Sequence, residues 1–211
     1  ENLGTVGAPV FLHNDPEKDI KVLNALQDEL QNCREFAISV AFITDSGIAP
    51  LLLTLEDLEK RGIPGRILTT DYLCFTNPRA LRKLNSYHNI EVRLFRYSDA
   101  GRGFHTKGYI FENPDLVHII IGSSNWTNTA LTTTEEWNTK LILKKEGRFA
   151  KDVFKKFEAL WKKSQPIDEV IDAYEAQWTA FTRSGATLTH LIDDRIDISQ
   201  PPNPNSMQRE F

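Results

Sequence analysis

Apolar residues recur along the first part of the chain in two patterns, one with helical spacing and one of short continuous runs. Ile20, Leu23, Leu26 and Leu30 lie three to four positions apart, which is typical of a helix with one buried face. The run EFAISVAFI at 35–43 is nearly all apolar, which predicts a strand buried on both faces. The chain is therefore expected to begin with a helix and a central strand.

The alternation of helix and strand patterns continues to residue 95. Gly and Pro residues mark the breaks between the segments. We expect a helix at 48–61, a strand at 66–70, a helix at 78–87 and a strand at 90–95. Alternating β and α elements predict an α/β sheet.

The second half of the chain carries three strand patterns followed by two helical ones. The strands are expected at 106–112, 116–121 and 137–143, and the amphipathic helices at 150–161 and 167–181. Turn residues between the first two strands predict a hairpin. The aromatic residues of the two helices lie at helical spacing, which is typical of core packing and not of a ligand platform.

Periodicity fades from Arg183 onward, where Pro201, Pro202 and Pro204 interrupt the chain. We expect three parts, which are a main domain at 1–165, a helical extension at 166–182 and a linker at 183–211.

Composition excludes some classes of protein. The 211 residues are 40% hydrophobic and 26% charged with a net charge of −4, which argues against a generally basic nucleic-acid binder. However, residues 79–107 hold seven Lys or Arg against two acidic residues, a local charge of +5. No apolar run approaches the ~18 residues that span a bilayer, so we expect no membrane partner. Cys33 and Cys74 lie far apart without metal-ligand spacing, which favours a reducing, cytoplasmic location.

The most specific chemistry lies between residues 105 and 136. His105 and Lys107 share one face of an expected strand, because side chains alternate along a strand. Ser123 and Asn125 follow in the loop GSSN, and Glu136 comes eleven residues after the asparagine.

These residue types suit cleavage of a phosphodiester. His105 can act as the nucleophile, Lys107 can place a positive charge on the phosphate, and Asn125 with Ser123 can donate hydrogen bonds to it. Glu136 can hold the imidazole in its reactive tautomer. One histidine and scattered carboxylates make a poor ligand set, so we expect no metal and no cofactor in this domain.

Taken singly, an HxK pair and a GSSN turn are more often structural. Combined in this order, they resemble the HxK(x)4D...GSxN signature of the phospholipase D superfamily, with Glu112 at the position that usually holds aspartate. The resemblance implies catalytic roles for His105, Lys107, Asn125 and Glu136. It also implies supporting roles for Ser123 and Glu112, and contact with the substrate through Gly122, Ser124 and Thr127.

The superfamily's fold is an α/β/α sandwich around a mixed β-sheet. Its chemistry uses a phosphohistidine intermediate, while a second histidine protonates the leaving group. This chain carries one such motif, so the resemblance implies a homodimer in which each subunit supplies His105.

Other stretches resemble the nuclease-type domain found at the front of bacterial superfamily 2 helicases. They include VAFITDSGI, RGIPGRILTT and IIIGSSNWTNTALTTTEEWN, and the tail PNPNSMQREF is similar to the start of such a helicase. Gln208 would then read adenine, with ATP and Mg²⁺ expected only in the helicase part. An unstructured proline-rich terminus is the alternative interpretation of this tail.

We therefore expect a metal-independent phosphodiesterase that cleaves nucleic acid, DNA in preference to RNA, as the N-terminal module of a helicase-linked restriction or repair protein. A catalytically inactive nucleic-acid-binding module is the first alternative. Phospholipid hydrolysis is the second, and the lack of an amphipathic membrane-binding segment disfavours it.

Overall fold

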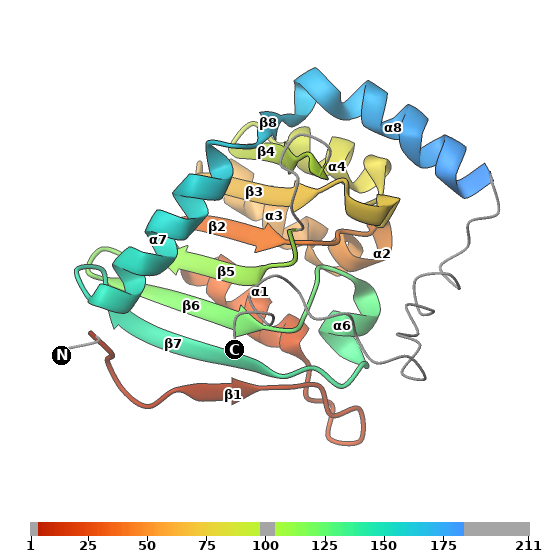
Figure 1. The fold of residues 1–211 in the computed structure, drawn as a ribbon. Coiled ribbons are helices and arrows are strands. Elements are labelled where there is room, and N and C mark those ends of the chain that lie inside the picture. The colour runs from red at the N-terminus through yellow and green to blue at the C-terminus, as the bar shows by residue number, and fades with distance from the viewer. Residues whose placement is uncertain (1–3, 98–103, 184–211) are drawn as a thin grey trace, which may run out of the picture.

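One eight-stranded β-sheet forms the centre of the structure, with helices on both faces (Figure 1). The computed structural model describes residues 4–97 and 104–183. The strand order is β1-β7-β6-β5-β2-β3-β4-β8. The strands are β1 (Val10–Leu12), β2 (Glu35–Val40), β3 (Gly65–Thr70), β4 (Ile90–Phe95), β5 (Lys107–Glu112), β6 (Leu116–Gly122), β7 (Asn138–Lys144) and β8 (Gln165–Pro166).

The helices follow the strands in an alternating order. The α-helices are α1 (Val22–Asn32), α2 (Asp45–Ile48), α3 (Leu52–Lys60), α4 (Pro78–Asn85), α6 (Asn128–Thr132), α7 (Arg148–Trp161) and α8 (Ile167–Arg183), and the 3-10 helices are η1 (Ala49–Leu51) and η2 (Tyr72–Cys74). The predicted α/β/α sandwich with a mixed sheet is confirmed. None of the helices in the described ranges is long and apolar enough to cross a membrane.

The sheet combines parallel and antiparallel pairs. β2, β3 and β4 run parallel, whereas β5 is antiparallel to both β2 and β6, and β7 is antiparallel to β6. The carboxyl ends of β2, β3, β4 and β6 therefore lie at the same edge as the amino ends of β5 and β7. The predicted hairpin of β5 and β6 is confirmed.

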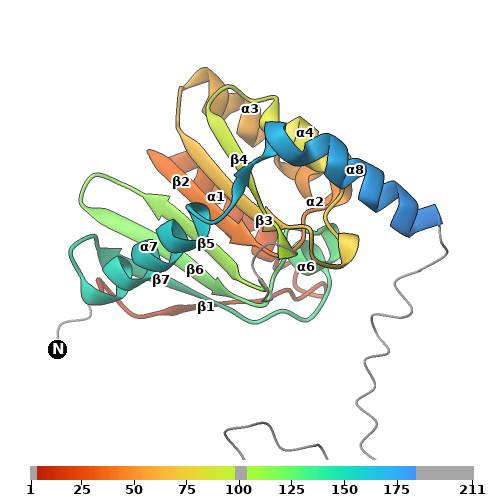
Figure 2. The same ribbon diagram turned by 45° about the horizontal axis from the view of Figure 1, so that its top comes forward.

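The two faces of the sheet are covered unequally (Figures 1 and 2). One face packs against residues of α1, α3, α4 and α8 in the larger core, and the other packs against α7 in a smaller core. β2 supplies both cores, with Phe36 and Ile38 in the larger and Ala37 in the smaller. This two-sided burial confirms the interpretation of the apolar run at 35–43.

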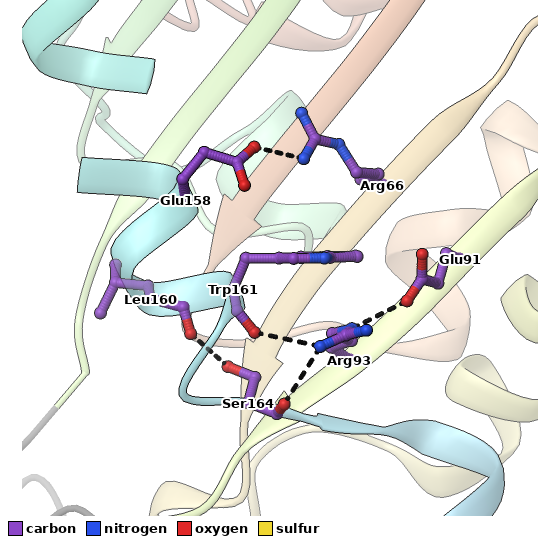
Figure 3. Close-up of polar contacts among 7 residues, drawn as sticks. All are labelled: Arg66, Glu91, Arg93, Glu158, Leu160, Trp161 and Ser164. Atoms are coloured by element: carbon purple, nitrogen blue, oxygen red, sulfur yellow. Dashed lines mark hydrogen bonds and ion pairs between the residues drawn. The ribbon is translucent and has the colours of Figure 1, made fainter. Parts of the chain in front are cut away.

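Two arginines of the sheet hold α7 in place (Figure 3). Arg66 forms an ion pair with Glu158, and its guanidinium carbon lies 5.0 Å from the ring centroid of Phe157 and 5.6 Å from that of Trp161. Arg93 lies 5.0 Å from the Trp161 ring and pairs with Glu91 at 2.8 Å. Trp161 thus packs against two cations, as a core aromatic and not as a ligand platform.

Several elements differ from the sequence-based expectations. The helix expected at 48–61 is divided into α2, η1 and α3, because Pro50 lacks the N–H that a continuous helix needs. The short elements β1, β8 and α6 were not predicted. α8, which corresponds to the expected helical extension at 166–182, packs into the larger core through Ile167, Val170 and Tyr174. Residues 184–211, including Gln208, lie outside the described residues.

Candidate active site

The predicted catalytic residues meet at one edge of the sheet. Lys107 pairs with Val40 of β2, and Gly122 at the end of β6 pairs with Asn138 at the start of β7. This register brings the amino end of β5, the loop after β6 and the segment before β7 together. We call this side, which carries His105, Lys107, Ser123, Asn125 and Glu136, the catalytic edge.

His105 lies just before β5 with its side chain exposed. Its ring makes an edge contact with Phe42, with 5.6 Å between the centroids. Partial burial lowers the pKa of His105, and the positive charge of Lys107 lowers it further. Both effects favour the neutral imidazole, which is the nucleophilic form.

Lys107 is nearly buried, with 9% of its surface exposed. Its Nζ donates to the backbone oxygen of His105 at 3.2 Å, and no ion pair joins it to any described residue. Burial lowers the pKa of Lys107, and the negative charge of Glu136 partly offsets this effect. The fold therefore holds a desolvated ammonium group beside the candidate nucleophile.

Glu136 and Ser123 are joined directly. The Ser123 hydroxyl donates to the Glu136 carboxylate and accepts from the backbone N–H of Trp137 at 3.0 Å. Glu136 is not hydrogen-bonded to His105 in this structure, so its expected role in orienting the imidazole stays a prediction. The contact with Ser123 was not foreseen, because it depends on the pairing of β6 with β7.

Asn125 is oriented by the backbone of the segment after β2. Its side-chain oxygen accepts from the Phe42 N–H at 3.2 Å. Because an amide side chain carries one acceptor oxygen and one donor NH₂ group, this bond leaves the NH₂ group for another partner. This NH₂ group has no hydrogen-bond partner among the residues at 4–97 and 104–183, and its role as a donor to a phosphate stays a prediction.

The three residues expected to contact the substrate have structural roles. A Cβ at Gly122 would lie 2.3 Å from Oδ1 of Asn138, so the close approach of the two strands requires glycine. Thr127 caps α6 by accepting from the N–H of Ala130 at 3.4 Å. Ser124 is fully buried and its Oγ accepts from Nδ2 of Asn138 at 2.9 Å. The Ser124 side chain therefore supports the loop, and contact of Gly122, Ser124 and Thr127 with a substrate stays a prediction.

Glu112 lies at the opposite end of β5 from Lys107. Its carboxylate pairs with Lys145 at 2.9 Å. Glu112 lies five positions after Lys107 in extended chain, which corresponds to about 17 Å. The structure therefore does not bring Glu112 to the catalytic edge, and any support it gives must act through the strand.

The sequence did not predict two features of the site. The Thr106 hydroxyl lies 2.7 Å from that of Ser39 and ties the residue between the two motif positions to β2. A cavity of about 550 Å³ opens beside His105, between the sheet and α7, and Ile110, Ile119, Ile121 and Val153 line part of it. The small residues of β2 and β5 are the sequence feature that could have indicated this cavity, because small side chains leave space between the sheet and α7.

The site offers an imidazole, an ammonium group, an amide and a carboxylate. Within the described ranges, no group of three or more His, Cys, Asp and Glu side chains could hold a metal ion.

The comparisons with known proteins agree with one another on the fold of this chain. Residues 26–161 match the family model described as cardiolipin synthase, PLD-like domain. NucT from Helicobacter pylori is similar with a TM-score of 0.59 and 19% identity, over 75% of this chain and 98% of that one. The phospholipase D family member Nuc from Salmonella typhimurium is similar with a TM-score of 0.56 and 17% identity, over the same shares.

A third solved structure is the phosphatidylserine synthase of Haemophilus influenzae Rd KW20. It has a TM-score of 0.55 and 15% identity, over 85% of this chain and 46% of that one. No curated protein matches the chain. At these identities the solved structures bear on the fold alone.

Proposed function

This chain belongs to the family of cardiolipin synthase, PLD-like domains, and from that premise we propose that it is a phosphodiesterase acting on nucleic acid, DNA in preference to RNA. The observation that carries the proposal is that His105 and the desolvated Lys107 lie close together in the chain at one edge of the sheet. The lowered pKa of His105 favours its neutral form. Groups with shifted pKa values that converge in this way are typical of catalytic sites.

The first step forms a covalent intermediate. A ring nitrogen of neutral His105 attacks the phosphorus, and the bond from phosphorus to the leaving oxygen breaks. Lys107 and the NH₂ group of Asn125 stabilise the negative charge on the other phosphoryl oxygens. The leaving oxygen keeps the bonding electron pair and takes a proton from a second histidine.

The second step releases the product. Water attacks the phosphorus and gives its proton to the second histidine, which is now neutral. The phosphorus–nitrogen bond breaks, and its electron pair returns to His105. Each turnover thus uses one neutral and one protonated imidazole and consumes one water.

We infer that the second histidine is His105 of the partner subunit in a homodimer. Among the described helices only α7 packs on the face of the sheet that forms the smaller core. The cavity beside α7 is lined by apolar residues next to His105. A second copy that covers this face would bury apolar surface and place its own motif opposite the first.

The chain's wider context is also a proposal. We place it as the N-terminal module of a helicase-linked restriction or repair protein. ATP and Mg²⁺ would then serve the helicase part, with Gln208 reading adenine.

The decisive experiment compares two histidine variants on a DNA fragment. His105→Ala is expected to abolish cleavage. His88→Ala serves as the control, because His88 is exposed and pairs with Glu59 away from the motif residues. Cleavage is also expected to persist in EDTA. Undiminished cleavage by His105→Ala would refute the nucleophile, and loss of cleavage in EDTA would refute the metal-free mechanism.

Two further measurements separate the alternatives. DNA binding by the native chain with no turnover would favour the non-catalytic binding module. Release of choline from phosphatidylcholine vesicles without DNA cleavage would favour a phospholipid hydrolase. For the dimer, addition of excess His105→Ala subunits is expected to lower the activity of the native chain as mixed dimers form.

A further inference from the structure

Phe42 lies two residues beyond the end of β2, opposite His105. Val40 of β2 pairs with Lys107 of β5, and two further steps of this antiparallel register place Phe42 across from His105. Side chains that lie directly opposite one another in an antiparallel pair are close neighbours. The rings of Phe42 and His105 are indeed in edge contact, with 5.6 Å between the centroids. The fold thus sets an aromatic ring against the candidate nucleophile.

The backbone of Phe42 holds a second group of the candidate site. Its N–H donates to Oδ1 of Asn125 at 3.2 Å, and its carbonyl oxygen accepts from the N–H of Trp126 at 3.0 Å. Trp126 is fully buried, so these two bonds join the segment after β6 firmly to Phe42. One residue therefore contacts the imidazole through its ring and the amide through its backbone.

A second aromatic ring supports Phe42 from another segment of the chain. Phe75 contacts the Phe42 ring edge-on, with 4.6 Å between the centroids. The N–H of Asn77 donates at 2.8 Å to the backbone oxygen of Ile43, the residue after Phe42. Asn77 is also the N-cap of α4, so the contact between the two rings is anchored on a helix.

The turn that leads to Phe75 has a strained backbone. Leu73 and Cys74 have φ angles of 57° and 54°, in the left-handed region that residues with a side chain rarely adopt. Such conformations persist only where the surrounding structure determines them, and they cluster at functional sites. In this protein the strained turn brings Phe75 against Phe42, and through it supports the ring beside His105.

We propose that Phe42 is a positioning residue for the cleavage reaction, whose ring holds the imidazole of His105 oriented for attack while its backbone holds the amide of Asn125. This inference rests on the proposed phosphodiesterase function and adds to it a residue outside the HxK and GSSN motifs. A nucleophile held in one orientation reacts faster than one that rotates, because less orientational freedom is lost on reaching the transition state. The ring also keeps water from one side of the imidazole, in agreement with burial as the main cause of the lowered pKa of His105.

The test compares Phe42→Leu with Phe42→Tyr, which keeps the ring. Phe42→Leu is expected to lower kcat for DNA cleavage about tenfold to a hundredfold with little change in KM, because the groups that bind the phosphate stay in place. Phe42→Tyr should have nearly the native kcat. Phe75→Leu, which loosens Phe42 without removing it, should give a smaller fall in kcat. Phe154→Leu is the matched control, because Phe154 is also partly buried against the smaller core but lies on α7.

NMR of the imidazole carbon protons of His105 gives a second readout that requires no activity. In Phe42→Leu these resonances should lose the ring-current shift of the aromatic ring. The pKa of His105 should rise toward its ordinary value of 6.5 as water reaches the imidazole. The acidic limb of the pH profile of cleavage should then move to higher pH by the same amount. Phe42→Tyr and Phe154→Leu should leave the pKa of His105 as in the native chain.

Each outcome bears on the proposal. A native kcat in Phe42→Leu, or a lower kcat with unchanged His105 resonances, would overturn it. An equal fall in kcat in Phe154→Leu, measured per folded molecule, would also overturn it, because loss of packing would then be the cause. If the native chain does not cleave DNA, the proposed function fails. The NMR comparison then decides by itself whether Phe42 holds the imidazole.

Discussion

Lys107 at the catalytic edge and Arg66 beneath α7 are both cations that the fold withdraws from solvent. Lys107 is 9% exposed, and the Arg66 side chain is 25% exposed. Arg66 has carboxylate partners in Glu158 and Glu35, and it also lies over two aromatic rings. Lys107 has only a backbone oxygen within hydrogen-bond distance among the described residues, and its pKa is lowered.

The difference indicates what each cation is for. A buried charge costs free energy unless other groups compensate it. The Glu158 carboxylate and two aromatic rings offset the charge of Arg66 and tie α7 to the sheet, although the buried Nε of Arg66 has no hydrogen-bond partner among the described residues (Figure 3). Under the proposed function, the charge of Lys107 is left for the phosphate of the substrate. We therefore propose that Arg66 is a structural cation and Lys107 a functional one.

The largest expected effect comes from Lys107→Met, which keeps the length of the side chain and removes its charge. Loss of one such preorganised charge is expected to lower the rate of DNA cleavage by about 10²–10³. Thermal unfolding should occur at the same or a higher temperature, because a desolvated ammonium group is removed. A cleavage rate within a factor of a few of the native rate would end the functional assignment of Lys107.

Arg66→Met makes the corresponding change at the structural cation. Two cation–π contacts and two partly exposed ion pairs are lost, which is expected to lower the free energy of unfolding by about 1–2 kcal/mol. Urea denaturation measures the loss, and the cleavage rate per folded molecule should stay near that of the native chain. If Arg66→Met stopped cleavage without destabilising the fold, the division between the two cations would be wrong.

Local sequence patterns predicted much of the fold. The apolar run at 35–43 gave a strand buried on both faces, and the turn at 113–115 gave the hairpin of β5 and β6. β1 and β8 were missed because they have three and two residues, too few for any periodicity. Their partners lie far away in the chain, where a local pattern carries no information.

The candidate site likewise has features that the sequence predicted and features that it did not. The spacing of the motif brought His105, Lys107 and the loop at 122–127 together. The bond from Phe42 to Asn125 joins residues 83 positions apart, and the burial of Lys107 depends on the packing of several elements. Neither could be read from residue types, although they decide which groups remain free for a substrate.

Glu112→Gln tests, at the other end of β5, whether a paired charge has a structural role. Glu112 is paired with Lys145 like a structural residue, although it belongs to the same motif as Lys107. Because the pair is partly exposed, we expect a loss of at most about 1 kcal/mol of unfolding free energy and an unchanged cleavage rate. Lys145→Gln should produce a similar loss of stability. A marked fall in cleavage with Glu112→Gln alone would mean that the strand transmits its effect to the catalytic edge.

The smallest expected effect is a change in the pKa of His105 itself. Burial and the charge of Lys107 both disfavour the imidazolium, so the pKa of His105 lies below its ordinary value of 6.5. The neutral nucleophile therefore persists to lower pH than in a free histidine, so the loss of cleavage on the acidic side follows this lowered pKa. The proposed mechanism also needs one protonated imidazole, so cleavage is expected to fall again at higher pH as that group loses its proton. Lys107→Met removes the smaller of the two causes, so the pKa of His105 should rise while staying below the ordinary value. Titration of the imidazole carbon protons by NMR measures this shift without requiring activity. If the pKa of His105 is the same in the native chain and in Lys107→Met, the charge of Lys107 lies too far from the imidazole for both groups to act on the same phosphate. The proposed joint role of His105 and Lys107 at the catalytic edge would then be wrong.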